Sequence, residues 1–315
     1  MPDICTLVLH TEFLKIEEWN TSSNYKSFCF LIFLFLQVNS LLLHINNVNK
    51  GTYITTVTNN KRESARMDTD FINLTPENLV NEHLCCIIRS KKYHPGIDAK
   101  RKWLADRLNE GHVFRKLNAK ATVFIEYAPL ETAWVPIIGD NYYYVYCLWV
   151  LGNEKGKGYG RSLMEYCIAD AKEKGKSGIC MLGAKKQKAW LSDQSFAKKC
   201  GFEVVDTTEN EYELLALTFD GTTPKFAQNA KKQEIENKEL TIYYDMQCPF
   251  IYQNIETIEQ YCEMHDIPLT LIQVDTLQKA KDLPCVFNNL GIFYKGNFET
   301  VNLLDIAGLK RILKK

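Results

Sequence analysis

The pattern of apolar and polar positions is clearest in the middle of the chain. Tyr142–Leu151 is continuously apolar and rich in aromatic and branched residues, which predicts a central strand covered on both faces. His112–Leu117 and Ala121–Tyr127 predict two strands that pair around a short polar turn. Between Asp98 and Glu110 the apolar residues recur at helical spacing, and Gly111 follows where a helix C-terminus favours glycine.

The segment before these elements also has helix and strand signals. Phe71–Leu74 predicts a short strand. Thr75 followed by Pro76 is typical of a helix start, because threonine caps a helix and proline suits its first turn. We expect this helix to bury its apolar residues, which are Leu79, Leu84, Ile87 and Ile88. Ala133–Ile138 extends the second strand of the pair or forms one of its own.

The elements after Leu151 alternate between helix and strand. We expect a helix over Gly160–Lys174, a strand over Ile179–Ala184 and a helix over Ser192–Cys200. A mixture of this kind indicates an α/β (α+β) fold, with a mixed sheet flanked by helices.

A second α/β pattern follows a polar stretch. Residues 220–239 are rich in Lys, Glu, Gln and Asn and are interpreted as a linker or surface helix. The elements expected beyond it are strands at Leu240–Asp245 and Leu269–Val274, helices at Pro249–Glu263, Thr276–Lys281 and Ile306–Leu313, and a hairpin around Lys295–Gly296–Asn297.

The first 66 residues do not resemble the rest. Phe28–Leu36 is apolar but shorter than the roughly 20 residues that a membrane span needs, so we expect no membrane anchor. Acidic residues precede this run, which argues against a signal peptide. Residues 1–66 are therefore interpreted as an atypical extension outside the functional fold, with translation starting at Met67.

The amino-acid composition argues against several classes of function. Lys+Arg and Asp+Glu both number 38, and this balance argues against a broad basic surface for nucleic acid or an anionic membrane. The 11 cysteines are scattered, odd in number and without a Cys-x-x-Cys pair, which favours free thiols in a reducing cytoplasm and predicts no metal site.

The most informative segment follows the central strand. A glycine-rich stretch joins this strand to a helix, and its backbone N–H groups and helix N-terminus suit a pyrophosphate. The stretch lacks the Gly-Lys-Ser/Thr of a Walker loop, and no acidic residue ends the next strand as a Rossmann site requires. A plain surface loop is the alternative. The residues expected to bind the pyrophosphate of a cofactor here are Lys155, Gly156, Lys157, Gly158, Tyr159, Gly160 and Arg161.

The segment Val145–Val205 resembles the GNAT superfamily of acetyltransferases. Lys155–Gly160 matches the Arg/Gln-x-x-Gly-x-Gly/Ala signature with Lys in first place, and Gly201-Phe202 follows the expected helix, strand and helix. The resemblance implies acetyl-CoA as acyl donor, a mixed sheet flanked by helices, and a gap beside the central strand. The residues that it implies along this gap are Cys147, Leu148, Trp149 and Val150, where a backbone N–H polarises the thioester carbonyl.

The catalytic acid and base are less well marked. The position where the family often carries a proton-donating Tyr is Ala197 here, so Tyr212 and Tyr159 are considered as substitutes. Glu126 and Glu131 are candidate bases, although glutamate is more often a solvated surface residue. His94 and His112 are further candidates.

The run from Met67 to Lys315 is similar to the YoaP-like group, which joins a GNAT domain to a domain with Cys-Pro-Phe and Pro-Cys-Val-Phe-Asn-Asn. Cys248–Phe250 and Pro284–Asn289 match these pieces. The resemblance and the element order imply a small thioredoxin-like domain, with Cys248 at a helix N-terminus that favours a reactive thiolate. Pro284 resembles the cis-proline of that fold, and Cys285 beside it is expected to approach Cys248. Simple structural cysteines are the alternative.

These features give four segments and three hypotheses of function. The segments are the extension 1–66, a GNAT domain 67–219, a linker 220–239 and a thioredoxin-like domain 240–315. The leading hypothesis is direct acetyl transfer to an amine of unknown identity, in a cytoplasmic enzyme for which a homodimer is one option. Its catalytic candidates are Tyr212, Glu126 and Cys248. The alternatives are a thiol-dependent redox or metalloid-binding protein whose GNAT domain only binds acyl-CoA, and an acyl-CoA sensor.

Overall fold

The computed structural model describes residues 70–85, 87, 93–188 and 191–315. These described residues all belong to one compact unit. The expected N-terminal extension and the start at Met67 lie outside the described residues. None of the described helices is long and apolar enough to cross a membrane.

A seven-stranded mixed sheet forms the centre of the N-terminal half, which confirms the predicted fold class. Its strands, in spatial order, are β1 (Phe71–Asn73), β2 (Val113–Leu117), β3 (Val123–Pro129), β5 (Tyr142–Val150), β6 (Gly178–Ala184), β8 (Tyr212–Thr218) and β7 (Glu203–Thr207). Strands β5 and β6 are parallel, and the other neighbours are antiparallel. The strongly apolar β5 lies at the centre, as its sequence predicted.

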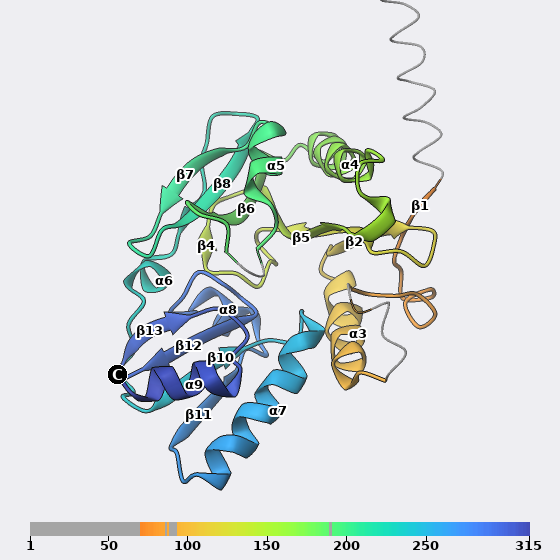
Figure 1. Cartoon of the computed structure of the whole chain (residues 1–315). Coiled ribbons are helices and arrows are strands. Elements are labelled where there is room, and N and C mark those ends of the chain that lie inside the picture. Colours follow the sequence, from red (N-terminus) through yellow and green to blue (C-terminus); the bar gives the residue numbers. More distant parts are fainter. Residues whose placement is uncertain (1–69, 86, 88–92, 189–190) are drawn as a thin grey trace, which may run out of the picture. The chain divides into compact units, whose positions relative to one another are not determined.

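Helices cover the two faces of this sheet (Figure 1). Helix α4 (Tyr159–Glu173) packs on one face, and its buried side chains are Leu163, Met164, Cys167 and Ala171. Helix α3 (Pro95–Leu108) and the C-terminal half lie on the other face, where α3 also contacts α7 (Pro249–Met264). A 3₁₀ turn, η3 (Gly152–Glu154), and the short helix α5 (Gln194–Lys199) complete this half.

Two local predictions are wrong. Residues 76–81 form turns, not a helix, because Asn78 bonds to the backbone: its Oδ1 accepts from Thr75 N at 2.9 Å and its Nδ2 donates to Asn73 O at 3.0 Å. Leu79 and Leu84 are nevertheless buried. In the expected strand Ala133–Ile138, only β4 (Ile137–Ile138) is extended, paired with β9 (Lys225–Phe226).

The C-terminal half has a four-stranded sheet in the order β11 (Leu269–Gln273), β10 (Leu240–Tyr244), β12 (Leu290–Tyr294), β13 (Asn297–Thr300). Strands β10 and β11 are parallel, and the remaining pairs are antiparallel. Helices α7, α8 (Leu277–Lys281) and α9 (Ile306–Leu313) complete it. The elements follow the predicted order, and their bounds lie within one or two residues of the prediction.

The segment 220–239, interpreted from sequence as a linker or surface helix, is part of the packed structure. It contains β9 and helix α6 (Gln228–Lys232), and it buries Phe226 and Ala230 completely. These two side chains belong to a core cluster that contains Tyr142 of β5 and Val286 of the C-terminal half. The two halves therefore share a hydrophobic core.

Candidate functional site

The site begins with an irregularity in β5. Glu126 of β3 pairs with Cys147, but Tyr127 pairs with Val145, so Tyr146 is an extra residue on β5. Such a bulge reverses the alternation of side chains beyond it. Before the bulge Val145 faces α4.

After the bulge the even-numbered residues face α4. Leu148 and Val150 pack in the cluster below α4, whereas Cys147 and Trp149 pack on the opposite face with α3 residues. The four residues implied to line the gap are thus divided, two on each face of β5.

Strand β5 also separates from β6. The two strands pair only from Tyr142 to Val145 of β5. Beyond this point the N–H of Leu148 donates to Ser192 Oγ at 3.2 Å. From the sequence Ser192 was expected only to begin a helix, and no sequence signal marks its contact with β5.

The glycine-rich loop lies beside this separation. Gly156 and Gly158 have left-handed backbones, with φ of +80° and +85°, and Gly158 is the N-cap of α4. The first N–H groups of a helix have no partner within it, so this end of α4 presents donors. A Cβ added to Gly160 would lie 3.6 Å from Val150 Cγ2 and 3.8 Å from Leu148 Cδ2, which places the loop against the separated part of β5.

Two exposed basic residues at this loop are paired with neighbouring acids. Lys157 Nζ lies 2.9 Å from Glu154 Oε2, and Arg161 Nε lies 3.0 Å from Glu165 Oε1. Exposed pairs of this kind are weak, about 0–1 kcal/mol, so an anion is able to displace them. Tyr159 contacts the ring of Phe71 edge-on and is partly buried in the α4 cluster.

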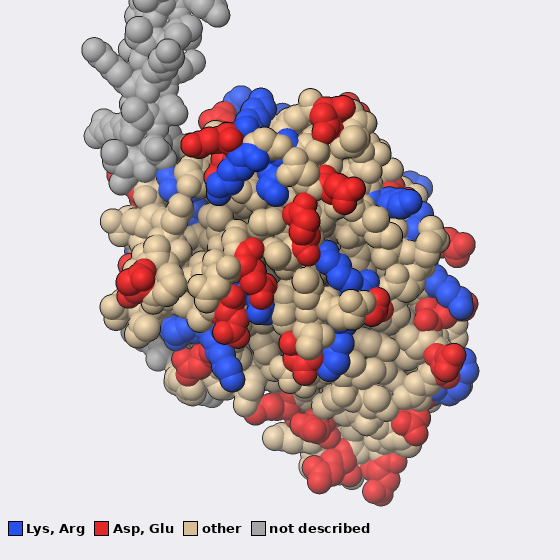
Figure 2. Space-filling view, turned by 180° about the vertical axis from the view of Figure 1, so that it is seen from behind, with Lys and Arg blue, Asp and Glu red and all other residues tan. Residues whose placement is uncertain are grey.

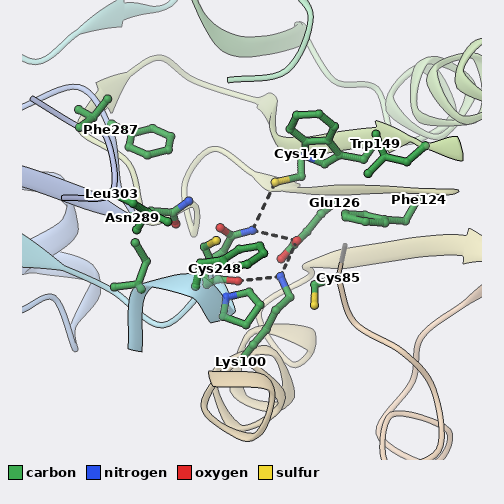
Figure 3. Close-up of a pocket in the computed structure, with 16 residues that line it drawn as sticks. Cys85, Lys100, Phe124, Glu126, Cys147, Trp149, Cys248, Phe287, Asn289 and Leu303 are labelled. Atoms are coloured by element: carbon green, nitrogen blue, oxygen red, sulfur yellow. Dashed lines mark hydrogen bonds and ion pairs between the residues drawn. The ribbon is translucent and has the colours of Figure 1, made fainter. Parts of the chain in front are cut away.

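A cavity of about 510 Å³ lies on the face of β5 opposite α4 (Figure 3). The N-terminal half contributes Cys85, Lys100, Phe124, Glu126, Cys147, Trp149 and Leu151. The C-terminal half contributes Gln247, Cys248, Pro249, Phe250, Ile251, Phe287, Asn289, Val301 and Leu303. The cavity is mainly apolar, and its volume is that of a small-molecule site.

The charged part of this wall is a buried ion pair. Lys100 Nζ lies 2.7 Å from Glu126 Oε2, and His112 Nε2 lies 3.1 Å from Glu126 Oε1. Burial alone would raise the pKa of Glu126, but the Lys100 ammonium and His112 hold it below its usual value. The pKa of His112 is lowered, chiefly by burial. The pair is therefore an ionised carboxylate facing an ammonium.

The expectation that Glu126 is a solvated carboxylate is wrong, because its exposed fraction is 0%. Glu131, by contrast, is exposed and accepts from Asn141 N at 2.7 Å. Lys100 was not singled out from the sequence. Its spacing from Trp103 and Leu104 places it on the buried face of the predicted helix, and that spacing was the available signal.

Gln247, just before Cys248, links the two halves at this pair. Its side-chain Nε2 donates to Glu126 Oε2 at 2.9 Å, and its backbone carbonyl accepts from Lys100 Nζ at 2.8 Å. Gln247 N donates to Asp245 Oδ1 at 2.9 Å, and Asn288 Nδ2 donates to Asp245 Oδ2 at 3.1 Å. Burial raises the pKa of Asp245 to about 7.

The thiols occupy different environments. Cys248 is the N-cap of α7, is half-buried and lines the cavity with Cys147 and Cys85. Cys285 is fully buried below Gly291, and burial raises its pKa to about 12. Cys285 is not part of the cavity wall, and no cis peptide bond occurs among the described residues, so Pro284 lacks the expected conformation. No group of metal-binding side chains occurs in the described ranges.

The candidate acids are not brought together with this cavity. Tyr212 is buried on β8, its ring 6.3 Å from that of Phe298 in the shared core, and burial raises its pKa. Ala197 is fully buried, also away from the cavity wall. His94 contacts the ring of Phe250 edge-on. The structure therefore gathers Glu126 and Cys248 around one cavity and places Tyr212 elsewhere.

Two family models match the chain, the Acetyltransferase (GNAT) family over residues 79–202 and YoaP-like over residues 268–314. One relative is the uncharacterized N-acetyltransferase YoaP of Bacillus subtilis (strain 168). It is 36% identical over 245 residues, which are 77% of this chain and 98% of the relative.

Solved structures give more distant matches. The PaiA N-acetyltransferase of Thermoplasma acidophilum, in complex with coenzyme A, is 18% identical with a TM-score of 0.33, over 47% of this chain and 99% of that one. The ribosomal-protein-S18-alanine N-acetyltransferase of Escherichia coli is 13% identical with a TM-score of 0.33, over 49% and 95%.

Proposed function

The chain belongs to the YoaP-like GNAT acetyltransferases, and from this we propose that it transfers an acetyl group from acetyl-CoA directly to the amine of an acceptor. The observation that carries the proposal is the separation of β5 from β6 beside the glycine-rich start of α4. Acetyl-CoA and the acceptor amine would then approach β5 from its two opposite faces.

The donor would lie on the α4 side. The N-terminus of α4 and the left-handed Gly156 and Gly158 favour a pyrophosphate, since backbone N–H groups and the helix dipole both attract anions. Leu148 and Val150 face this side and would contact the carbon chain of the pantetheine arm of acetyl-CoA.

The thioester would lie at the separated edge of β5. The N–H of Leu148 points away from β3 and donates to Ser192. A carbonyl oxygen taking the place of the serine hydroxyl would accept this N–H, which polarises the carbonyl and stabilises the charge that develops during attack.

The acceptor would lie in the cavity on the other face. Its nitrogen forms a bond to the carbonyl carbon, the carbon–sulfur bond breaks, and the proton lost by the amine ends on the CoA thiolate. Both oxygens of Glu126 already accept hydrogen bonds, so we assign Glu126 to positioning Lys100 and Gln247. Tyr212 lies in the shared core and has no part in this proposal.

We also propose that residues 240–315 are a thioredoxin-like domain that has become part of the acetyltransferase. The strand order β11-β10-β12-β13, with α7 following β10, supports this. The trans Pro284 and the residue Ile251 in place of a second cysteine depart from a redox-active member of that fold.

The proposal is tested by acetyl-CoA binding in calorimetry and by CoA release with a panel of amines. Gly158→Glu places a carboxylate where the pyrophosphate binds and should abolish both. Gly221→Glu is the matched control, because Gly221 is also left-handed, with φ of +83° and no atom within 4 Å of an added Cβ. Wild-type protein that binds no acetyl-CoA, or equal behaviour of the two variants, would overturn the proposal.

A further inference from the structure

The cavity beside Glu126 is built jointly by the two halves of the chain. Figure 3 shows Phe287, Leu303 and Asn289 on one side of it, and Trp149, Phe124 and Glu126 on the other. The first group belongs to the C-terminal half and the second to β3 and β5. The C-terminal half therefore forms part of the wall against which an acceptor would lie.

Most of the wall is apolar. Four aromatic side chains, Phe124, Trp149, Phe250 and Phe287, line it together with Leu151 and Leu303. A ligand that buries apolar surface against them gains roughly 25 cal/mol per Å². The wall therefore favours an acceptor with an apolar, ring-sized body.

The polar residues in the wall carry no net charge. Glu126 is neutralised by Lys100, and the third partner, His112, is buried. A polyamine or amino sugar would have to leave water without an opposing charge, which is costly. The wall thus disfavours acceptors with several charges. The same desolvation would lower the pKa of a single bound ammonium group and so favour the neutral amine that attacks a thioester.

Two amide atoms in this wall have no hydrogen-bond partner among the described residues. Gln247 is 2% exposed. An ionised carboxylate only accepts hydrogen bonds, so the Nε2 of Gln247, and not its Oε1, faces Glu126. The Oε1 of Gln247 is left unused. Asn289 is 7% exposed, and its Oδ1 accepts from Asn288 Nδ2, which leaves its own Nδ2 unused. The wall therefore holds one unused acceptor and one unused donor.

We infer that the acceptor is a primary amine on an apolar, ring-sized body that also carries a neutral group able to donate and accept, such as a carboxamide, and that Gln247 and Asn289 recognise this group. The inference rests on the proposed acetyl transfer and adds the class of its acceptor. Buried polar groups select strongly for ligands that satisfy them, because an unsatisfied group costs about 1–3 kcal/mol.

The test compares phenylalaninamide with phenethylamine, putrescine and spermidine, using CoA release with the full chain. Phenylalaninamide should have the highest kcat/KM, and the two polyamines should be at least tenfold poorer than phenethylamine. Asn289→Leu, similar in size, should raise KM about tenfold for phenylalaninamide, with under twofold change for phenethylamine and for acetyl-CoA binding.

Asn302→Leu is the matched control, because Asn302 is exposed and outside the cavity. If Asn289→Leu does not fold, Phe250→Ala replaces it and should raise KM for both ring-bearing amines. Preference for polyamines, or an equal effect of Asn289→Leu on both ring-bearing amines, would overturn the inference and leave the proposed function standing. No CoA release with any amine would instead overturn the proposed function.

Discussion

The side chain of Gln247 donates to the buried carboxylate of Glu126 at 2.9 Å, across 121 residues of sequence. This contact joins the C-terminal half to the centre of the acetyltransferase sheet. Both signs of charge are interspersed on the face shown in Figure 2, whereas the cavity wall holds its charges in one buried pair. The stability of the fold and the shape of the cavity are therefore expected to depend on the same few residues.

Glu126→Gln is expected to lower the free energy of unfolding by about 3–5 kcal/mol, because it leaves the buried Lys100 ammonium without its counter-charge. Glu165→Gln is the control: Glu165 pairs with Arg161 on the surface, and its loss should cost at most about 0.5 kcal/mol. Urea unfolding followed by circular dichroism measures both. If both substitutions lower the free energy of unfolding equally, the buried pair contributes no more to stability than the surface pair.

The raised pKa of Asp245 predicts that the free energy of unfolding depends on pH. Its pKa in the folded protein is raised to about 7, while an unfolded Asp titrates near 3.9. The folded state therefore holds a proton that the unfolded state releases, so this contribution is fully present below about pH 4 and is lost as the pH rises to about 7. The loss is about 4 kcal/mol at most.

Asp245→Asn removes this titration. Urea unfolding at a series of pH values between 4 and 8 should show wild-type stability falling relative to that of the variant as the pH rises. A constant difference between the two proteins over this range would contradict the raised pKa of Asp245.

Gly156→Ala is expected to weaken acetyl-CoA binding at least tenfold, because a Cβ at this left-handed position disturbs the loop that would hold the pyrophosphate. Gly175→Ala is the control. Gly175 lies at the other end of α4 and is also left-handed, and an added Cβ would have no atom within 4 Å at either Gly156 or Gly175. Both variants should lose about 1–2 kcal/mol of stability. If calorimetric titration shows the same affinity for both variants, the loop is not part of the acetyl-CoA binding site.

Ser192→Ala is expected to raise kcat/KM for acetyl-CoA by up to about fivefold, because the thioester carbonyl must displace the Ser192 hydroxyl from the N–H of Leu148, and one such bond contributes about 1 kcal/mol. Ser192→Thr keeps the hydroxyl and should behave like the wild type. KM for the amine should not change. A lower kcat/KM of Ser192→Ala would show that the carbonyl does not take the place of the hydroxyl.

Cys248 is expected to react with iodoacetamide at neutral pH at least tenfold faster than Cys285. Cys248 is half-buried at the N-terminus of α7, whereas Cys285 is fully buried and its pKa is raised to about 12. Peptide mass spectrometry over time measures both rates, with a small thiol as reference. Alkylation should also raise KM for the amine, because Cys248 lines the cavity. A Cys248 that reacts more slowly than the reference thiol would be a structural cysteine.

The sequence by itself determined the elements whose signals are local. The apolar run of β5, the glycine-rich loop after it and the start of α4 are contiguous, so strand, loop and helix were placed to within a residue or two. The order of elements from Leu240 to Leu313 was predictable for the same reason, because hydrophobic periodicity is a property of neighbouring residues.

The tertiary structure alone decided which polar residues are buried and what they contact. Glu126 looked like a surface carboxylate because glutamate usually is one, and only packing against Lys100 and Gln247 removes it from water. The bulge at Tyr146 and the contact of Leu148 with Ser192 are likewise set by the register of separate strands and loops. Burial of a charge depends on partners that are distant in the sequence, and local patterns do not record them.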